Sequence, residues 1–163
     1  MKADQTPLPK ILVLASGSGT NLQALIDASR ERDFPGQIIA VGCNQPGAFA
    51  LERAAQANIE TFVVNHKNFE SRDEFDASLM AEILRYNPDL IVLAGFMRIL
   101  TTDFVRAFRG KMLNIHPSLL PKYTGLNTHR RALEAGDTVH GVSIHFVTEE
   151  LDGGPVIAQA EVA

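Results

Sequence analysis

Two polar side chains stand two residues apart in the last third of the chain, at the end of a short apolar segment. Asn114 and His116 close the segment 111–116, which is typical of a buried strand, and alternate residues of a strand face the same side. Pro117 disfavours helical backbone at His116 and keeps that residue extended. An amide can donate to a developing oxyanion, and an imidazole can move a proton near neutral pH. The pair is therefore suited to acyl-group chemistry, although a histidine at a strand end is often structural and an asparagine there often caps a turn.

A carboxylate that could complete the pair lies near the C-terminal end of the sequence. Asp152 is followed by Gly153, Gly154 and Pro155, a flexible corner that could carry a side chain into a cleft. A carboxylate beside His116 would favour the imidazolium, fix the orientation of the ring and accept a transferred proton. The same residues are typical of a solvated turn, which is the commoner explanation when only the spacing is considered.

A glycine-rich loop follows the first apolar run of the chain. Residues 16–21 read Ser-Gly-Ser-Gly-Thr-Asn, and they separate the strand-like run 11–15 from a helical pattern over 22–30. This order places free backbone amides and a helix N-terminus where an anion can bind, and the interleaved hydroxyl and amide side chains favour a phosphate. The loop is neither a Walker A motif nor a complete GxGxxG motif, because Leu22 stands in the third glycine position. A tight turn that needs glycine for positive φ angles is the alternative explanation.

Strand-like and helical patterns alternate over the first two thirds of the chain. The predicted strands are residues 11–15, 37–43, 59–64, 89–94 and 111–116, and the predicted helices between them are 22–30, 48–57, 71–86 and 101–108. Short connections in this order predict a Rossmann-like, doubly wound α/β fold, with a mostly parallel sheet and helices on both faces. The remaining segments predict a loop over 118–126, a helix over 128–134, and strands over 139–147 and 156–162.

Length and composition predict one globular domain. The chain has 163 residues, enough for a single sizeable core, and 45% of them are hydrophobic while 21% are charged. The net charge of −4 argues against a general nucleic-acid or membrane-surface protein. Cys43 is the only cysteine, which excludes an internal disulfide and fits a reducing, cytoplasmic location. We expect residues 1–9 to form a flexible lead-in and residues 10–163 to form the domain.

Four segments give the chain a family resemblance. They are residues 16–24 (SGSGTNLQA), 93–98 (LAGFMR), 113–123 (LNIHPSLLPKY) and 145–155 (HFVTEELDGGP). Together they closely resemble the folate-dependent formyltransferases, and the similarity runs from about Lys10 to the end of the chain. The Asn-x-His and Asp set belongs to the whole family. The Ser-Gly-x-Gly-[Ser/Thr]-Asn loop singles out the branch that must hold a ribose phosphate, because its acceptor is glycinamide ribonucleotide.

The resemblance implies an enzyme of de novo purine biosynthesis with the formyltransferase fold. It would transfer a formyl group from its co-substrate, 10-formyltetrahydrofolate, to the amine of glycinamide ribonucleotide, and it would use no metal. Its partners would be these small molecules, with no nucleic acid and no membrane. It would be a monomer or a weak homodimer.

The resemblance also implies the roles of individual residues. Asn114, His116 and Asp152 would be catalytic, and Gly19, Thr20 and Asn21 would bind the substrate phosphate. The folate pocket would be lined by Arg72, Met97, Arg98, Ile99, Leu100, Asn114, Thr148, Glu149, Glu150, Leu151 and Asp152. Arg72 would lie near the glutamate tail of the folate, although an exposed arginine without a ligand is the commoner explanation for that residue.

The chain departs from the family pattern in the loop after the catalytic strand. Thr124 stands where proline is usual and Asn127 where histidine is common, which affects the rigidity of the loop more than the chemistry. The family also continues past the equivalent of Ala163, so we expect the domain to lack a C-terminal segment that helps to hold the ribonucleotide. The alternatives are a related enzyme that uses water or an aminoacyl-tRNA as acceptor, and a binding module without turnover. The glycine loop argues against the first alternative, and the intact catalytic set argues against the second.

Overall fold

The computed structural model describes residues 6–162, and the contacts divide the chain into two compact units. The first unit ends at Met97 and the second begins at Arg98. The first five residues of the predicted lead-in lie outside the described residues, as does residue 163, while residues 6–9 form neither a helix nor a strand. Within residues 6–162, no helix is long and apolar enough to cross a membrane.

The first unit is built on four parallel strands. They are β1 (Lys10–Ala15), β2 (Gln37–Cys43), β3 (Glu60–Val63) and β4 (Leu90–Leu93), in the order β3-β2-β1-β4. β1 lies between β2 and β4, and its side chains from Leu12 to Ala15 are completely buried. A strand that is covered on both faces is apolar throughout instead of alternating, which explains the continuous apolar run over residues 11–15.

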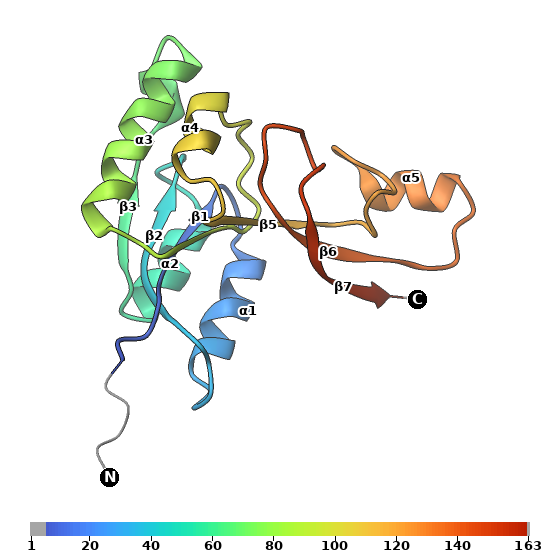
Figure 1. Cartoon of the computed structure of the whole chain (residues 1–163), viewed down its shortest axis with the longest axis horizontal. Helices are drawn as coiled ribbons and strands as arrows, with labels where there is room; N and C mark the ends of the chain where they lie inside the picture. The colour runs from blue at the N-terminus through green and yellow to red at the C-terminus, as the bar shows by residue number, and fades with distance from the viewer. Residues whose placement is uncertain (1–5, 163) are drawn as a thin grey trace. The chain divides into compact units, whose positions relative to one another are not determined.

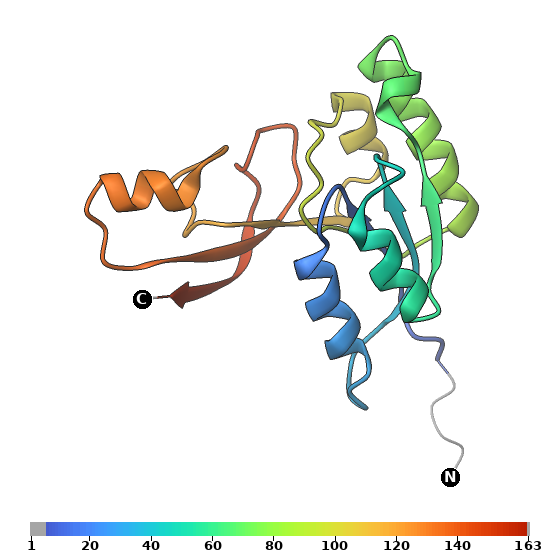
Figure 2. The ribbon, with the colours of Figure 1, turned by 180° about the vertical axis from the view of Figure 1, so that it is seen from behind.

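Three helices connect these strands. They are α1 (Thr20–Ser29), α2 (Phe49–Gln56) and α3 (Arg72–Tyr86), and a short 3-10 turn, η1 (His66–Asn68), precedes α3. α1 and α2 lie on one face of the four strands and α3 lies on the other (Figures 1 and 2). Right-handed crossovers require this arrangement, because the chain moves outward from β1 to β3 and then returns across the sheet to β4. Phe75, Leu79 and Ile83 recur at helical spacing along α3, and all three are buried.

The loops that follow β1 and β4 meet at the carboxyl edge of this unit. The Ser16 amide donates to the Gly95 carbonyl at 3.3 Å, and the Ser16 hydroxyl accepts from the Met97 amide at 2.7 Å. In open α/β sheets, ligands bind at the carboxyl edge where the strand order switches direction, and β1 and β4 form that point here. The glycine-rich loop and the predicted folate residue Met97 therefore lie at the same edge of the first unit.

The second unit holds three antiparallel strands and two helices. Its elements are α4 (Thr102–Ala107), β5 (Met112–His116), α5 (Thr128–Glu134), β6 (His140–Phe146) and β7 (Val156–Val162). β6 pairs with β5 on one side and with β7 on the other. Along β6, buried residues alternate with partly buried ones, whereas every residue of β7 is exposed. The alternating sequence of β7 therefore does not create a buried face in this unit.

Local sequence signals mark the ends of several helices. The Ser71 hydroxyl accepts the Glu74 amide at 3.2 Å where α3 begins, and the Thr101 hydroxyl accepts the Phe104 amide at 3.3 Å where α4 begins. Asn58, which follows α2, has a φ of 59°, the left-handed conformation that terminates many helices. The predicted helices and strands are all present, and their boundaries differ from the predicted ones by at most about two residues, because capping chemistry is local and can be recognised in the sequence.

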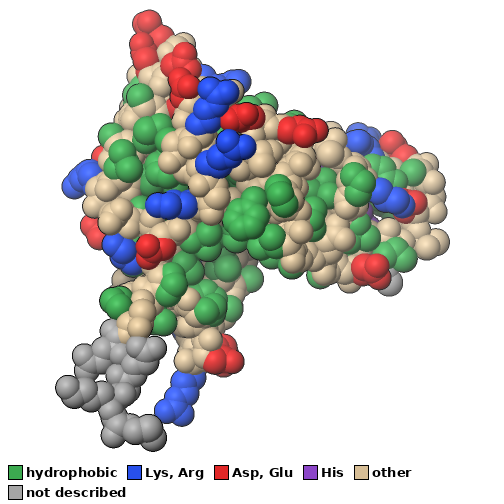
Figure 3. Space-filling view, in the orientation of Figure 1, with side chains coloured by type: hydrophobic (Ala, Val, Ile, Leu, Met, Phe, Trp, Pro, Cys, Tyr) green, Lys and Arg blue, Asp and Glu red, His purple; other side chains and the backbone are tan. Residues whose placement is uncertain are grey.

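Charged side chains of both signs are mixed on the surface. Figure 3 shows Lys and Arg side chains interspersed with Asp and Glu side chains on the face that it draws. Ion pairs join Arg106 to Glu149 at 3.0 Å and Arg85 to Glu82 at 3.2 Å. Exposed pairs of this kind each contribute only about 0–1 kcal/mol, so the fold rests on its buried strands and helix faces.

Candidate active site

β5 presents Asn114 and His116 on the same side of the strand, as the sequence predicts. In the antiparallel pairing with β6, Asn114 lies opposite His145 and His116 lies opposite Ser143. His116 is buried and Asn114 is half-buried. Because water is largely excluded around them, the hydrogen bonds of both side chains are electrostatically stronger than they would be in solvent.

Asp152 reaches this pair from the turn between β6 and β7. Only 6% of its side chain is exposed, and its φ of 54° turns the backbone sharply. The Phe146 amide donates to the Pro155 carbonyl at 3.0 Å and closes the turn. A Cβ on Gly154 would lie 1.8 Å from the Phe146 carbonyl oxygen, so this position requires glycine. The Asp-Gly-Gly corner therefore folds onto β6 and carries the carboxylate inward, and it is not a solvated turn.

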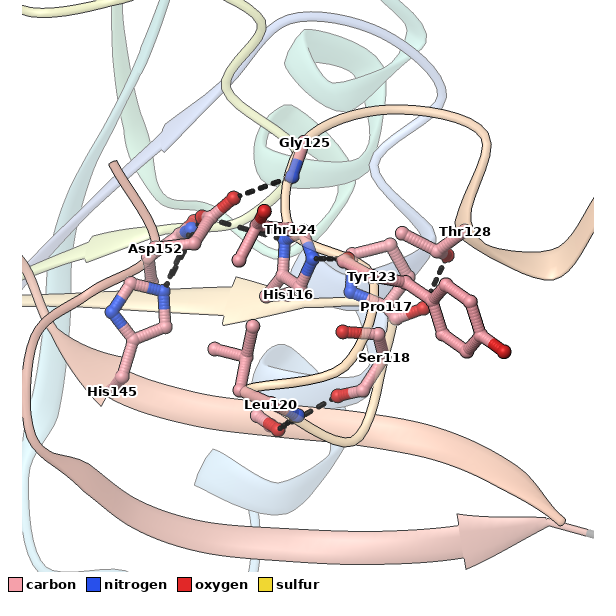
Figure 4. Close-up of polar contacts among 12 residues, drawn as sticks. His116, Pro117, Ser118, Leu120, Tyr123, Thr124, Gly125, Thr128, His145 and Asp152 are labelled. Atoms are coloured by element: carbon pink, nitrogen blue, oxygen red, sulfur yellow. Dashed lines mark hydrogen bonds and ion pairs between the residues drawn. The ribbon is translucent and has the colours of Figure 1, made fainter. Parts of the chain in front are cut away.

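The imidazole of His116 is held through both of its nitrogens (Figure 4). Nε2 lies 2.8 Å from the carbonyl oxygen of Tyr123, and Nδ1 lies 3.5 Å from Oδ1 of Asp152. A carbonyl oxygen only accepts, so Nε2 carries a proton and Nδ1 is the nitrogen at which the protonation state can change. The 3.5 Å separation is longer than a normal N–H···O hydrogen bond, so Nδ1 can turn to another oxygen at little cost.

A second buried histidine lies against the same carboxylate. His145 Nε2 is 3.8 Å from Oδ1 of Asp152 and 3.2 Å from Nδ2 of Asn114, and its Nδ1 is 3.0 Å from the Phe146 carbonyl. The carbonyl assigns the proton to Nδ1, so Nε2 accepts one N–H of the Asn114 amide. His145 thereby fixes the orientation of that amide and leaves its second N–H for a ligand. Figure 4 shows the rings of His116 and His145 both directed at Asp152.

Two backbone groups of the loop between β5 and α5, residues 117–127, contact the same cluster. The Tyr123 carbonyl accepts from His116, as described above, and the Gly125 amide donates to Oδ2 of Asp152 at 2.8 Å. Two residues of one loop, separated by a single residue, therefore reach the imidazole and the carboxylate. The position of this loop therefore determines whether Nε2 of His116 and Oδ2 of Asp152 have backbone hydrogen-bond partners.

A buried serine anchors the first part of this loop to β6. The Ser143 hydroxyl donates to the Ser118 carbonyl at 2.7 Å and accepts from the Leu120 amide at 3.0 Å. Gln159 of β7 donates from Nε2 to the Leu120 carbonyl at 3.0 Å and to the Ser143 hydroxyl at 2.9 Å. Because Ser143 lies opposite His116 in the strand pairing, this network ties the loop directly to the strand that carries Asn114 and His116.

In the first unit, the glycine-rich loop leads into α1 by a close approach to α2. Gly19 is the N-cap residue of α1 with a φ of 74°, and a Cβ there would lie 2.8 Å from Ala50. The Arg53 guanidinium of α2 donates to the Ser18 carbonyl at 2.7 Å. The first amides of a helix have no partner within it, so the amides at the start of α1, beginning at Thr20, are available to an anion.

Several predicted folate residues are apolar and exposed. The side chain of Met97 in the first unit is 65% exposed, and those of Ile99 and Leu151 in the second unit are 60% and 62% exposed. Large apolar side chains of this kind can be covered by the ring of a ligand. Their exposure is compatible with the predicted role.

The charged residues of the predicted folate set have different surroundings. Arg72 is exposed as the first residue of α3, where the helix dipole gives its charge no support. Glu149 is already paired with Arg106 of α4 at 3.0 Å. The charge of Glu149 is therefore balanced within the second unit, while Arg72 lies on the surface of the first unit.

The only thiol of the chain is not part of this chemistry. Cys43 is buried at the end of β2, and burial raises the pKa of its thiol to about 11, so the thiol is protonated and a poor nucleophile near neutral pH. Among residues 6–162, no three His, Cys, Asp or Glu side chains are grouped so that they could hold a metal ion.

Comparison with known proteins decides the family. A family model described as formyl transferase matches residues 9–163. The chain belongs to the formyl transferase family. The resemblance predicted from the four sequence segments is confirmed, and the matched range contains the Asn114, His116 and Asp152 cluster.

Individual members of the family are similar along most of the chain. Phosphoribosylglycinamide formyltransferase of Escherichia coli is 58% identical over 152 residues, which are 93% of this chain and 72% of the relative. The human trifunctional purine biosynthetic protein adenosine-3 is 48% identical over 153 residues, which are 94% of this chain and 15% of that protein. The solved structure of phosphoribosylglycinamide formyltransferase from Coxiella burnetii, in complex with CHES, has 55% identity and a TM-score of 0.90, and the match covers 96% of this chain and 73% of that one. The predicted fold class is therefore confirmed.

Sequence reasoning missed three members of the cluster in this formyl transferase. His145 lies in the family-like segment 145–155 but is not predicted as a site residue, because its contact with Asn114 depends on the register of β5 against β6. The Tyr123 carbonyl and the Gly125 amide are backbone groups without a side-chain signal. The sequence predicts a loop for the Lys-Tyr-Thr-Gly segment after Pro121, and its composition indicates only that the loop turns sharply.

Proposed function

We propose that this formyl transferase moves a formyl group from 10-formyltetrahydrofolate to the amine of glycinamide ribonucleotide, in the de novo synthesis of purines. The observation that carries the proposal is the cluster on β5, in which an amide and an imidazole lie side by side and a buried carboxylate contacts the imidazole. Acyl transfer to an amine needs an oxyanion donor and a group that manages the proton, and this cluster supplies both. The single buried cysteine supports a cytoplasmic location.

The acceptor is bound through its phosphate by the glycine-rich loop. Gly19, Thr20 and Asn21 begin α1, so their amides and the helix dipole attract an anion, and the Thr20 hydroxyl adds a further donor. The first turn of α1 contains no acidic residue that would oppose a phosphate. The negative net charge of the chain makes such a local arrangement necessary for an anionic substrate.

The formyl donor is bound by residues 97–100 and 148–152, and Arg72 binds its glutamate tail. The apolar side chains of Met97, Ile99 and Leu151 are exposed and suit the flat ring system of a folate. A guanidinium pairs with a carboxylate through two parallel hydrogen bonds, which suits Arg72 to the tail.

The chemical step is a direct attack of the neutral amine on the formyl carbon. A tetrahedral intermediate forms with negative charge on the formyl oxygen, and the free N–H of Asn114 and Nδ1–H of protonated His116 donate to that oxygen. A donor of this kind typically lowers the barrier by about 3 kcal/mol. Asp152 accepts the proton lost by the attacking nitrogen and passes it toward N10 of the folate as the C–N10 bond breaks. Direct transfer requires no enzyme nucleophile, in keeping with the buried position of Cys43.

The experiment that tests this function compares acceptors. Consumption of 10-formyltetrahydrofolate by the purified chain is followed with glycinamide ribonucleotide, with an aminoacyl-tRNA, and with water as the only acceptor. The proposal expects consumption that depends on the ribonucleotide and yields one formylated product per donor consumed. Equal consumption in water alone would identify a hydrolase. Stabilisation by the folate without consumption in any mixture would identify a binding module.

A further inference from the structure

The main-chain segment 123–125 that contacts the catalytic cluster is itself held by a side-chain pair outside the cluster. Tyr123 is half-buried, and its hydroxyl donates to Oδ2 of Asp137 at 2.5 Å. The same residue offers its backbone carbonyl to Nε2 of His116 at 2.8 Å. One residue thus joins His116 on one side to Asp137 on the other, and neither Tyr123 nor Asp137 has a role in the proposed chemistry.

Asp137 is a firm partner because it is fixed at the end of α5. Its amide donates to the Ala132 carbonyl at 3.0 Å, and Gly136 before it has a φ of 74°, the geometry of a helix C-terminal cap. Lys122 contributes a second contact to its carboxylate at 3.4 Å. Its hydrogen bond with Tyr123 lowers the pKa of the Asp137 carboxyl, and the same bond raises the pKa of the tyrosine.

The backbone of Tyr123 adopts a conformation that is unfavourable for a bulky residue, so the Tyr123–Asp137 hydrogen bond has to stabilise it. Its φ is 56°, a left-handed conformation that bulky residues rarely adopt. Such a conformation persists only where the surroundings determine it. Arg131 of α5 adds to these surroundings, because its guanidinium lies 5.4 Å from the centroid of the tyrosine ring and donates to the Thr124 carbonyl at 2.5 Å.

We propose that Tyr123 and Asp137 are positioning residues for the formyl transfer, acting through the backbone of residues 123–125. Their hydrogen bond holds the Tyr123 carbonyl against Nε2 of His116, so that the ring turns Nδ1 toward Asp152 and the formyl oxygen. It also holds the Gly125 amide against Oδ2 of Asp152. Without the side-chain bond, the segment relaxes, His116 loses the acceptor that fixes its proton on Nε2, and both nitrogens share the proton.

The inference has two testable consequences. The expected change in kcat rests on the proposed function, whereas the expected change in the protonation pattern of His116 rests on the geometry alone. In Tyr123→Phe, only the hydroxyl is removed. We expect kcat to fall about tenfold while KM for each substrate stays within a factor of two. Asp137→Ala should match Tyr123→Phe, and the double variant should be no worse than either single variant. Asp137→Asn keeps an oxygen that can accept from the tyrosine, so it should recover most of the lost turnover.

The spectroscopic arm uses ¹⁵N-labelled histidine side chains without any substrate. The His116 signals are assigned from their absence in His116→Gln. In the wild type they should show the pattern of a ring protonated at Nε2, and in Tyr123→Phe the pattern of a mixture of the two tautomers. The matched control is Tyr86→Phe, which removes the hydroxyl of the only other tyrosine and should change neither measurement.

The outcomes separate this inference from the proposed function. A Tyr123→Phe protein that melts as the wild type does and keeps either the wild-type kcat or the wild-type His116 pattern would overturn the positioning role. A wild type that transfers no formyl group to the ribonucleotide would overturn the proposed function. In that case the His116 pattern of Tyr123→Phe still decides whether the Tyr123–Asp137 bond positions the ring.

Discussion

At the scale of single residues, the chemistry of the site is set by the partner that each polar atom already has. Nε2 of His116 is taken by a backbone carbonyl and one N–H of Asn114 by His145. Nδ1 of His116 has only the long 3.5 Å contact with Asp152, so in the proposed chemistry Nδ1 and the second N–H of the amide serve the formyl oxygen. Asp152 is buried between two imidazoles and one backbone amide. Because each side chain has its own hydrogen-bond partners, the role of each residue can be tested by a separate substitution.

The role of Asp152 in moving the proton can be tested with Asp152→Asn. The amide oxygen can still accept from Gly125, so the turn should fold, but the side chain cannot take up a proton. We expect turnover to fall about 10²- to 10⁴-fold, the usual range for a lost general acid or base. The acid limb of the pH–rate profile should also change, because the carboxylate that must be ionised is gone. An unchanged profile would remove Asp152 from the proton path.

The role of His145 can be tested by comparing two replacements. His145→Leu leaves the Asn114 amide without its buried acceptor, which should cost about 1–3 kcal/mol of unfolding free energy and lower turnover. His145→Gln still offers an acceptor oxygen, so it should lose less unfolding free energy and less turnover than His145→Leu. The measurements are urea denaturation and formyl transfer. If His145→Leu turned over at the wild-type rate, Asn114 would not depend on His145.

Some of these residues could be predicted from the sequence and others could not, for a physical reason. Asn114 and His116 belong to one strand, whose period of two places both on the same side whatever surrounds them. Asp152 and His145 lie on other segments, and their contacts depend on the pairing of β5 with β6 and on the turn that follows β6. The role of Asp152 is predicted by the family resemblance, whereas the spacing of the residues does not predict a role for His145.

At the scale of the elements, one anchored loop contacts the side chains that β5 and the β6–β7 turn present. Residues 117–127 are tied at their start to Ser143 of β6 and further along to Asp137, which follows α5. The ends of the helices could be predicted, because Ser71, Thr101 and Asn58 act on their immediate neighbours. The path of the loop could not be predicted, because it depends on hydrogen bonds that span up to 39 residues.

The Tyr123–Asp137 bond should make stability depend on acid pH. The folded-state pKa of Asp137 is lowered, chiefly by the tyrosine hydroxyl, so its contribution to stability is present above the unfolded pKa and is lost as pH falls through the folded one. The difference in unfolding free energy between wild type and Asp137→Asn should therefore be constant from about pH 7 to pH 5 and should shrink below about pH 4. Denaturation at each pH measures it. A difference that persisted unchanged at pH 2 would show that the carboxylate charge is not involved.

At the scale of the whole molecule, the fold is that of the formyl transferase family, and the chain spans about three quarters of its bacterial relatives. The alternation of strands and helices was enough to predict the parallel part of the sheet, because βαβ units allow few arrangements. The exposure of β7 was not predictable, because an alternating pattern shows which residues share a face and not whether anything covers that face.

The buried thiol provides a test of the integrity of the first unit. Burial raises the pKa of Cys43 to about 11, so at pH 8 only roughly 0.1% of the thiol is ionised. A thiol reagent should therefore label the native protein about a hundredfold more slowly than free cysteine, and urea should bring the rate to that of the free amino acid. Rapid labelling without urea would show that β2 opens in the native state.

The central claim is that the Asn114, His116 and Asp152 cluster transfers the formyl group directly to the ribonucleotide. The most direct measurement follows a ¹³C-formyl label from 10-formyltetrahydrofolate into glycinamide ribonucleotide, in the wild type and in His116→Ala, with circular dichroism to show that both are folded. We predict that with the wild type the label appears as an N-formyl group on the amine of the ribonucleotide, and that with His116→Ala it appears at least about 10²-fold more slowly. Equal rates in the two proteins, or label released as formate, would contradict the account.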